Sequence, residues 1–172
     1  AAPVEWAVIN GEVETGVTVI RMNEKMDAGP IAARKPTSIG EGENAGQLKS
    51  RLAEMGAGLL LGVLKELERA SIGLPEQDES KATLAGKLEK RNGLLDWSLP
   101  ARRLADFARG VTPWPGAFTF LSAGSKPGRP LRLILQDVAP VELDAGSADP
   151  GEIVSVRPDL IVAAGSGAVR VG

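Results

Sequence analysis

Residues 15–30 restrict the fold more than any other stretch, because they combine a strand, a polar loop and the start of a second strand. β-Branched residues recur over residues 16–22, which predicts the first strand. Ala28-Gly29-Pro30 then marks a turn, and extended character resumes at residues 31–34. Asp27 therefore lies in a loop just beyond a strand, where open α/β sheets bind their ligands. A plain turn is the competing interpretation, because Asp before Ala-Gly is common turn chemistry.

A long amphipathic helix is predicted after this stretch. Asn44 can cap its start, and Gln47 three residues later completes a capping-box pattern. Apolar residues then recur at three- and four-residue steps, namely Leu48, Leu52, Met55, Leu59, Val63 and Leu67, and Leu60 and Leu64 widen the stripe. Three glycines inside the helix each cost about 1 kcal/mol relative to alanine, so we expect a sheet to approach closely there. These glycines are Gly56, Gly58 and Gly62.

Two shorter helices and several strands complete the prediction. Pro3 suits the start of a helix over residues 3–10, and Ser98 can cap another over residues 99–109. The polar stretch of residues 76–98 predicts a linker and a domain boundary. Short strands at the spacing found here suggest a small barrel or sandwich. The predicted strands are residues 117–121, 131–138, 151–156, 160–164 and 168–171.

The composition excludes several chemistries. The 172 residues contain neither cysteine nor histidine, so disulfides, thiolate metal sites and imidazole bases are excluded, and no metal is expected. No apolar run approaches the ~20 residues that span a bilayer, and residues 1–11 lack a secretory signal, so a cytoplasmic location is the default expectation. Residues 81–132 carry 10 basic and three acidic side chains, a net charge of +7 between acidic ends. This basic middle is a candidate surface for a polyanion, and an ordinary solvated surface is the equal alternative.

Several short motifs together resemble one protein family. A first group resembles the second half of the folate-dependent formyltransferase domain: Ala1-Ala2-Pro3, Asn10-Gly11-Glu12, residues 14–18 and Met26-Asp27-Ala28-Gly29. A second group extends the resemblance to the methionyl-tRNA formyltransferase family: Gln77-Asp78-Glu79, Ala82-Thr83, Lys87-Leu88, Asp96-Trp97-Ser98 and residues 113–118. The motifs keep their order and spacing across essentially the whole chain. Sugar-nucleotide formyltransferases share the first group and part of the second, so they are the nearest alternative.

The resemblance implies a fold class of α/β plus β. Residues 1–75 would form the C-terminal half of a Rossmann-like formyltransferase domain, and residues 76–98 a linker. Residues 99–172 would form a small OB-like β-barrel that binds tRNA. In the family the preceding segment holds the catalytic Asn and His. Because this sequence contains no histidine, we expect it to be a fragment of a longer protein and to be inactive alone.

The resemblance also implies a reaction, transfer of a formyl group from 10-formyltetrahydrofolate to the amino group of methionyl initiator tRNA, by a monomer. Such an acyl transfer needs a stabilised oxyanion, a proton shuttle and a group that orients the shuttle. Asp27 matches by motif position the family's Asp that orients the catalytic His, so Asp27 is the expected catalytic residue. Met26 and Asp27 are the expected folate contacts.

A tRNA partner requires Lys and Arg side chains gathered on one face, where they neutralise phosphates. The expected tRNA-binding residues are Lys87, Lys90, Arg102, Arg103 and Arg109, and Lys126, Arg129 and Arg132 could extend this strip. The three arginines of the helix after residue 98 are expected to remain available to solvent. An alternative of another class is a non-catalytic nucleic-acid-binding module, against which the acidic first 80 residues and the long core helix argue.

Overall fold

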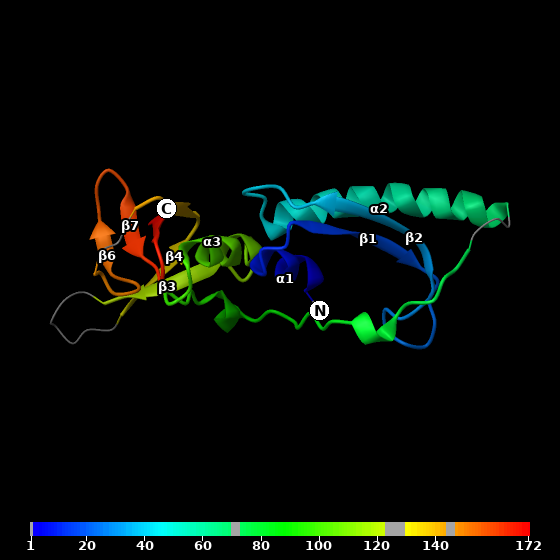
Figure 1. The fold of residues 1–172 in the computed structure, drawn as a ribbon, viewed down its shortest axis with the longest axis horizontal. Helices are drawn as coiled ribbons and strands as arrows, with labels where there is room; N and C mark the ends of the chain where they lie inside the picture. Colours follow the sequence, from blue (N-terminus) through cyan, green and yellow to red (C-terminus); the bar gives the residue numbers. More distant parts are fainter. Residues whose placement is uncertain (1, 70–72, 123–129, 144–146) are drawn as a thin grey trace.

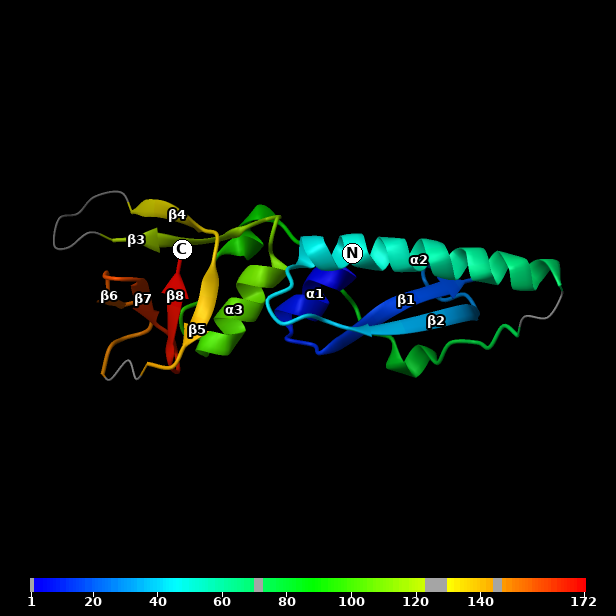
Figure 2. The same ribbon diagram turned by 90° about the horizontal axis from the view of Figure 1, so that it is seen from above.

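The computed structural model describes residues 2–69, 73–122, 130–143 and 147–172. In chain order the helices are α1 (Pro3–Ile9), α2 (Ala45–Glu68), the short 3₁₀ turns η1 (Glu79–Lys81) and η2 (Lys90–Gly93), and α3 (Ala101–Gly110). The strands are β1 (Glu14–Ile20), β2 (Ile31–Ser38), β3 (Ala117–Leu121), β4 (Leu131–Leu135), β5 (Val138–Val141), β6 (Ile153–Ser155), β7 (Leu160–Ala163) and β8 (Ala168–Val171). The molecule is elongated, with β1, β2 and α2 at one end and β3 to β8 at the other (Figure 1). α1 and α3 lie side by side between the ends in both views (Figures 1 and 2).

The first end is an antiparallel hairpin packed against α2. β1 and β2 pair from Glu14 opposite Ser38 to Ile20 opposite Ile31, with an irregularity after Val19. The two predicted strands are confirmed on either side of the loop that holds Asp27, but β1 begins and ends two residues earlier than predicted and β2 continues four residues further. The buried residues between hairpin, α1 and α2 are Val8, Ala45, Leu48 and Leu52.

Helix α2 begins with the predicted capping box. The Asn44 side chain accepts a hydrogen bond from the amide of Gln47 at 2.9 Å, and the Gln47 side chain accepts one from the amide of Asn44 at 3.0 Å. These two bonds satisfy N–H groups that have no partner inside the helix. No helix in the described part of the chain is long and apolar enough to cross a membrane.

The apolar stripe of α2 is buried at some positions and exposed at others. Leu48, Leu52 and Val63 are 0%, 6% and 6% exposed, whereas Leu60, Leu64 and Leu67 are 45%, 48% and 48% exposed. The predicted stripe is therefore confirmed at the three buried positions, and the latter three leucines are only partly covered by the described residues.

The expected close approach of the hairpin to the helix glycines is confirmed at one position. A Cβ added at Gly56 would lie 3.6 Å from Cγ1 of Val17, which is ordinary contact, whereas nothing described lies within 4 Å of a Cβ at Gly58 or Gly62. These two glycines line an open groove between α2 and β2 instead. The prediction is wrong there because the hairpin side of the groove also carries small residues, such as Ala33.

The second end contains two antiparallel sheets. β3 pairs with β4 alone, and the other strands form a four-stranded sheet in the order β5-β8-β7-β6. The strand predicted over residues 131–138 is split, because the amides of Gln136 and Asp137 both donate to the carbonyl of Gly172, at 2.8 and 3.0 Å. The described residues do not close these sheets into one barrel.

Helix α3 starts two residues later than predicted. The amide and hydroxyl of Ser98 bond to Oδ1 of Asp96, at 3.1 and 2.7 Å, so Ser98 does not cap the helix. The flanking residue at the helix start is Pro100, which provides no side-chain cap. Leu104 and Ala108 are buried and belong to the inner face of the helix.

One hydrophobic core joins α1 and the predicted linker to the second end of the molecule. It includes Ile9 of α1, Leu88 and Leu95 of the linker, and buried residues of α3 and β8 such as Leu104 and Val169. A Cβ added at Gly110 would overlap Cγ1 of Ile9, so α1 and α3 pack without room for a side chain there. The predicted linker is thus packed against its neighbours along part of its length.

Candidate functional site

The loop of residues 21–30 connects β1 to β2 and carries the predicted catalytic residue. The amide of Arg21 donates to the carbonyl of Pro30 at 2.9 Å and closes the base of the loop. Gly29 is shielded from solvent for most of its surface, and a Cβ there would overlap the carbonyl oxygen of Arg21. Only glycine fits at that position, so the chain can turn tightly under the loop.

The two expected folate contacts lie together at the tip of this loop. Both Met26 and Asp27 are exposed, Met26 to 88%. Asp27 has φ = +54°, and it is the one non-glycine residue with a positive φ in the described ranges. Aspartate adopts the left-handed region more readily than most residues do. The Asp27 side chain is thus exposed at the tip of the loop.

Pro75 and the start of the predicted linker supply groups that hold this turn. The amide of Ile31 donates to the carbonyl of Pro75 at 2.8 Å. The side-chain Nε2 of Gln77 donates to the backbone carbonyls of Asp27 and Gly29, at 2.8 and 2.7 Å. In the sequence Gln77 is noticed only as part of a family motif. No local pattern predicts its contact with Asp27, 50 residues away.

An ion pair also joins the linker to the loop. Nζ of Lys25 lies 2.9 Å from Oε1 of Glu79, and the two side chains are 70% and 71% exposed. The hydrogen bond to Glu79 raises the pKa of Lys25 above its usual value, and the same bond lowers the pKa of Glu79. Because both groups remain in water, the pair contributes little to stability.

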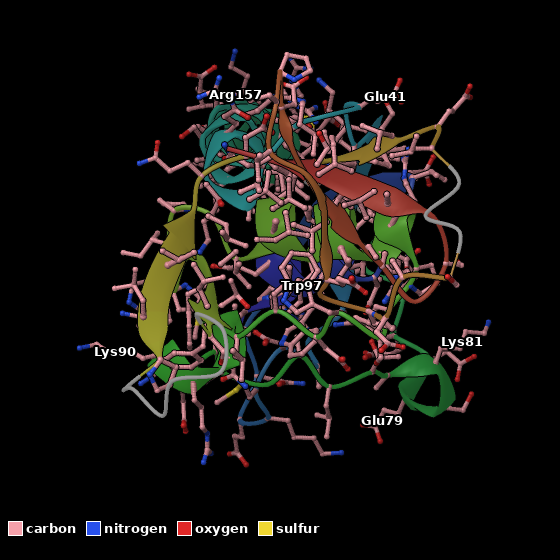
Figure 3. The ribbon with its side chains drawn as sticks, turned by 90° about the vertical axis from the view of Figure 1, so that its left-hand side faces the viewer. Glu41, Glu79, Lys81, Lys90, Trp97 and Arg157 are labelled. Atoms are coloured by element: carbon pink, nitrogen blue, oxygen red, sulfur yellow. The ribbon has the colours of Figure 1, made fainter. Side chains whose placement is uncertain are left out.

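The basic residues expected to bind tRNA differ in their exposure to solvent and in their hydrogen-bond partners. Lys87 and Lys90 of the linker and Arg102 of α3 are exposed. Figure 3 shows Lys90 extending away from the ribbon. Arg103 is half-buried, and its Nη1 donates to the carbonyl of Asn10 at the end of α1.

Arg109 is not available to solvent, so that expectation is wrong. Its side chain is 19% exposed, and Nη2 lies 2.6 Å from Oδ1 of Asp106, whose side chain is 4% exposed. Nη1 of Arg109 donates to the carbonyl of Glu43 at 2.7 Å. Sequence reasoning missed the buried Asp106, although the spacing of three residues to Arg109 on one helix face could have indicated the pair.

Of the three residues expected to extend the basic strip, the structure describes Arg132 alone. Its guanidinium carbon lies 4.0 Å from the centroid of the Phe118 ring, a cation–π contact. Phe118 and Phe120 meet edge to face, with ring centroids 5.8 Å apart. Lys126 and Arg129 lie outside the described residues.

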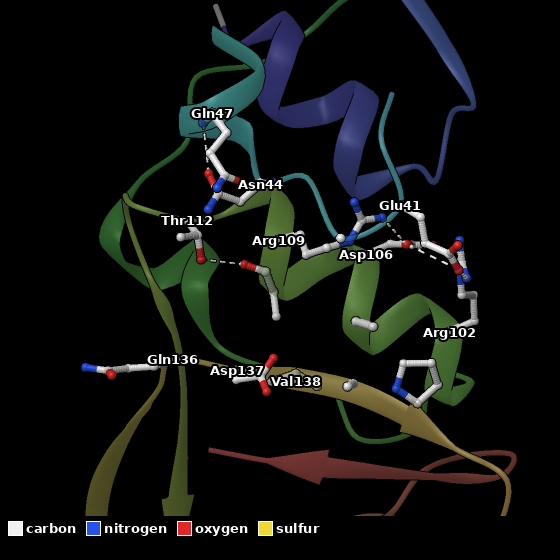
Figure 4. A pocket seen from close by; sticks show the side chains of 15 residues that line it. Glu41, Asn44, Gln47, Arg102, Asp106, Arg109, Thr112, Gln136, Asp137 and Val138 are labelled. Atoms are coloured by element: carbon white, nitrogen blue, oxygen red, sulfur yellow. Dashed lines mark hydrogen bonds and ion pairs between the residues drawn. The ribbon is translucent and has the colours of Figure 1, made fainter. Parts of the chain in front are cut away.

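A pocket of about 390 Å³ lies where the two ends of the molecule meet, between α3, the loop before α2 and the start of β5 (Figure 4). Most of its charged groups pair with one another: Arg102 lies 3.5 Å from Asp106 and 3.8 Å from Glu41. In the part of the chain that the structure describes, no three Asp or Glu side chains come together as a metal site would require. The Arg102–Glu41 pair is largely exposed, so it contributes little to stability.

Comparison with known proteins identifies the class. The model described as "Formyl transferase" matches residues 1–64, and "Formyl transferase, C-terminal domain" matches residues 87–172. The chain belongs to the formyl transferase family, with parts of both domains, as the sequence motifs predicted.

Within this class the chain is a homologue of methionyl-tRNA formyltransferases. It is 41% identical over 171 residues to the methionyl-tRNA formyltransferase of Solibacter usitatus, covering 99% of this chain and 52% of that protein. It is 42% identical to the enzyme of the same name from Anaeromyxobacter dehalogenans strain 2CP-1, covering 97% and 52%. The chain thus spans about half the length of the curated relatives it matches.

A solved structure shares the fold. The N-formyltransferase from Helicobacter canadensis, in complex with folinic acid and dTDP-3-aminofucose, superposes with a TM-score of 0.75. The match covers 100% of this chain and 60% of that one, at 12% identity. At this identity the likeness supports the fold alone, so it does not decide between tRNA and nucleotide sugar as the formyl acceptor.

Proposed function

We propose that the complete protein transfers the formyl group of 10-formyltetrahydrofolate to the amino group of methionyl initiator tRNA, as a monomer in the cytoplasm. The observation that carries this proposal is the identity of 41–42% to methionyl-tRNA formyltransferases along nearly the whole chain. In this proposal residues 1–75 belong to a Rossmann-like formyltransferase domain, residues 76–98 connect the domains, and residues 99–172 form an OB-like domain for tRNA.

The proposed role of Asp27 follows from the chemistry of acyl transfer. The amino group attacks the formyl carbon, an oxyanion develops, and a proton leaves the amine. An imidazole that handles this proton is oriented, and its charged form is favoured, by a carboxylate within hydrogen-bond reach. Asp27 supplies that carboxylate, while the family's Asn and His would come from outside these 172 residues, which contain no histidine.

The same loop is the proposed folate contact. A pterin is a flat ring system with hydrogen-bond donors and acceptors along its edge. Backbone N–H and C=O groups of a loop can bind that edge independently of the side chains. Met26 and Asp27 lie at an exposed turn whose shape is maintained by the close packing of Gly29 and by hydrogen bonds from neighbouring residues. This arrangement supports the proposal because a fixed backbone edge is needed for such recognition.

The proposed tRNA surface begins with Lys87, Lys90 and Arg102, whose side chains are exposed. Arg103 and Arg109 belong to the same basic stretch but are less exposed. Arg103 donates to the backbone carbonyl of Asn10, and Arg109 donates to that of Glu43. The net charge of +7 over residues 81–132 supports binding of a polyanion in this region.

The direct test is formylation by the complete protein. We expect formylation of methionyl initiator tRNA with 10-formyltetrahydrofolate as donor, much slower formylation of methionyl elongator tRNA, and none of a nucleotide-linked amino sugar. Rapid formylation of the sugar instead would favour the competing sugar-nucleotide formyltransferase. Tight tRNA binding without formylation would favour the non-catalytic binding module.

The tRNA surface is tested by charge reversal. Lys87→Glu and Lys90→Glu are each expected to weaken tRNA binding and to lower the slope of log K against log salt by about one for each phosphate that the variant no longer neutralises. Lys65→Glu, on the exposed surface of α2 and outside the basic stretch, is the matched control. An unchanged affinity and an unchanged salt slope in both linker variants would contradict this surface.

A further inference from the structure

We propose that Gln77 is a positioning residue that fixes the direction of the Asp27 side chain from the linker. The inference rests on the proposed function, because it assigns a task in that reaction to a residue that does not itself touch the reacting atoms. It is carried by the contacts between the Gln77 side chain and the loop, and by the backbone conformation of Asp27.

The Gln77 amide uses both of its N–H donors on the loop. Nε2 donates to the carbonyl of Asp27 at 2.8 Å and to the carbonyl of Gly29 at 2.7 Å. A carboxamide nitrogen has two donors, so the two bonds use its full capacity. Gln77 itself is half-buried, which limits competition from water for these bonds.

The contact is one of a series that residues 75–79 make with the loop and with the start of β2. The backbone carbonyl of Pro75 accepts from the amide of Ile31, whereas Gln77, and Glu79 at the start of η1, reach the loop through their side chains. The loop contacts run in the opposite direction, from Ile31 back to Lys25.

These bonds act where the loop backbone departs from the ordinary regions. Asp27 has φ = +54°, in the left-handed region, which aspartate tolerates better than most residues but adopts less often than the ordinary regions. The bond to its own carbonyl fixes the peptide plane that follows Asp27, and the bond to Gly29 fixes the plane two residues later. Together they restrain the backbone around Asp27, and with it the direction of the Cα–Cβ bond from which the carboxylate extends.

A residue that orients a proton shuttle must be held closely. Displacement of a catalytic group by about 1 Å can cost about 100-fold in rate, even when the cause lies outside the reacting atoms. Without the Gln77 bonds the turn can relax to ordinary backbone conformations, in which the carboxylate leaves its position. We therefore expect loss of Gln77 to lower kcat much more than it changes KM for methionyl-tRNA.

The test compares three variants of the complete protein. Gln77→Glu has the same shape but places carboxylate oxygens against the two carbonyls, Gln77→Lys restores N–H donors, and Glu79→Gln removes only the exposed ion pair with Lys25. We expect Gln77→Glu to lower kcat about 10- to 100-fold with KM for methionyl-tRNA within about twofold. Gln77→Lys should recover part of that loss, and Glu79→Gln should stay within about twofold of the wild type.

Amide hydrogen exchange over residues 21–31, which include the hydrogen-bonded amides of Arg21, Lys25 and Ile31, gives a second readout that does not depend on catalysis. Gln77→Glu should raise exchange in this loop about tenfold or more, and Glu79→Gln should not. A Gln77→Glu variant with wild-type kcat would overturn the positioning role, whether or not its loop exchanges faster. Unchanged amide exchange in that variant would overturn it as well. If the unsubstituted protein fails to formylate methionyl-tRNA at all, the proposed function itself is overturned, and the exchange data then show separately whether the contact holds the loop.

Discussion

Nη2 of Arg109 lies 2.6 Å from Oδ1 of Asp106, and this pair joins α3 to the loop before α2, because Nη1 of the same guanidinium donates to the carbonyl of Glu43. Asp106 is the one polar or charged residue that is fully buried in the described ranges. The junction between the two ends of the molecule therefore depends on a buried charge and its partner.

Removing Asp106 should weaken this junction strongly. Asp106→Ala leaves the guanidinium of Arg109 largely buried without its carboxylate, and loss of one partner of a buried pair costs about 3–5 kcal/mol. Urea unfolding of the protein should show a loss of that size. Asp137→Asn breaks the exposed pair of Asp137 with Arg170 and should cost about 0–1 kcal/mol. Equal losses in the two variants would contradict the role given to Asp106.

Two glycine substitutions should have opposite effects. Gly29→Ala places a Cβ against the carbonyl oxygen of Arg21, so the base of the loop must open and stability should fall by several kcal/mol. Gly58→Ala meets nothing described within 4 Å and lies inside α2, so it should stabilise by about 0.5–1 kcal/mol. Thermal unfolding measures both, and a stabilising Gly29→Ala would contradict the tight turn.

The capping box of α2 gives a smaller, well-defined prediction. Asn44→Ala removes the side chain that accepts from the amide of Gln47 at 2.9 Å, and such losses cost about 1 kcal/mol. Ser50→Ala, which removes a hydroxyl bonded to the carbonyl of Gly46 within the helix, is the matched control and should change stability by less. An Asn44→Ala protein as stable as the wild type would show that the cap does not act in solution.

Acid should weaken the contact between α2 and the loop before it. Two bonds from the Arg51 guanidinium, each 2.8 Å, lower the pKa of the Glu43 carboxylate below its usual value. The stabilisation is therefore fully present above the unfolded pKa of about 4.3 and is lost as the pH falls through the lower folded pKa. Unfolding free energies measured from pH 7 to pH 3 should fall less steeply in Glu43→Gln. Parallel curves for the two proteins would contradict the pairing.

Local sequence signals predicted the elements well. The Asn44–Gln47 capping box, the hairpin around the Asp27 loop and most strands of the second half follow from periodicity and turn chemistry, which act over a few residues. Strand β5 is the exception, because it lies almost entirely beyond the strand predicted over residues 131–138. The start of α3 was misplaced because Ser98 has a competing local partner, Asp96, that satisfies the same hydroxyl. Both outcomes depend on neighbours in sequence, so they are the part that a sequence can specify.

Contacts between distant segments could not be read in the same way. Arg109 was expected to face solvent because its helix position allows it, but Asp106 and the Glu43 carbonyl hold it at the junction. Gln77 gave no local sign that its amide reaches Asp27 across the fold. Long-range pairing also decides which strands form one sheet and whether the sheets close into a barrel. Local spacing of the strands therefore could not settle the barrel expectation.

The Asp27 carboxylate has the central place in the proposed formyl transfer to methionyl-tRNA. The most direct measurement is kcat/KM for formylation by the complete protein carrying Asp27→Asn, which keeps the side-chain shape and removes the charge. We expect a loss of at least about 100-fold, with the loop conformation and tRNA affinity retained. A kcat/KM equal to that of the unsubstituted protein would contradict this role of Asp27.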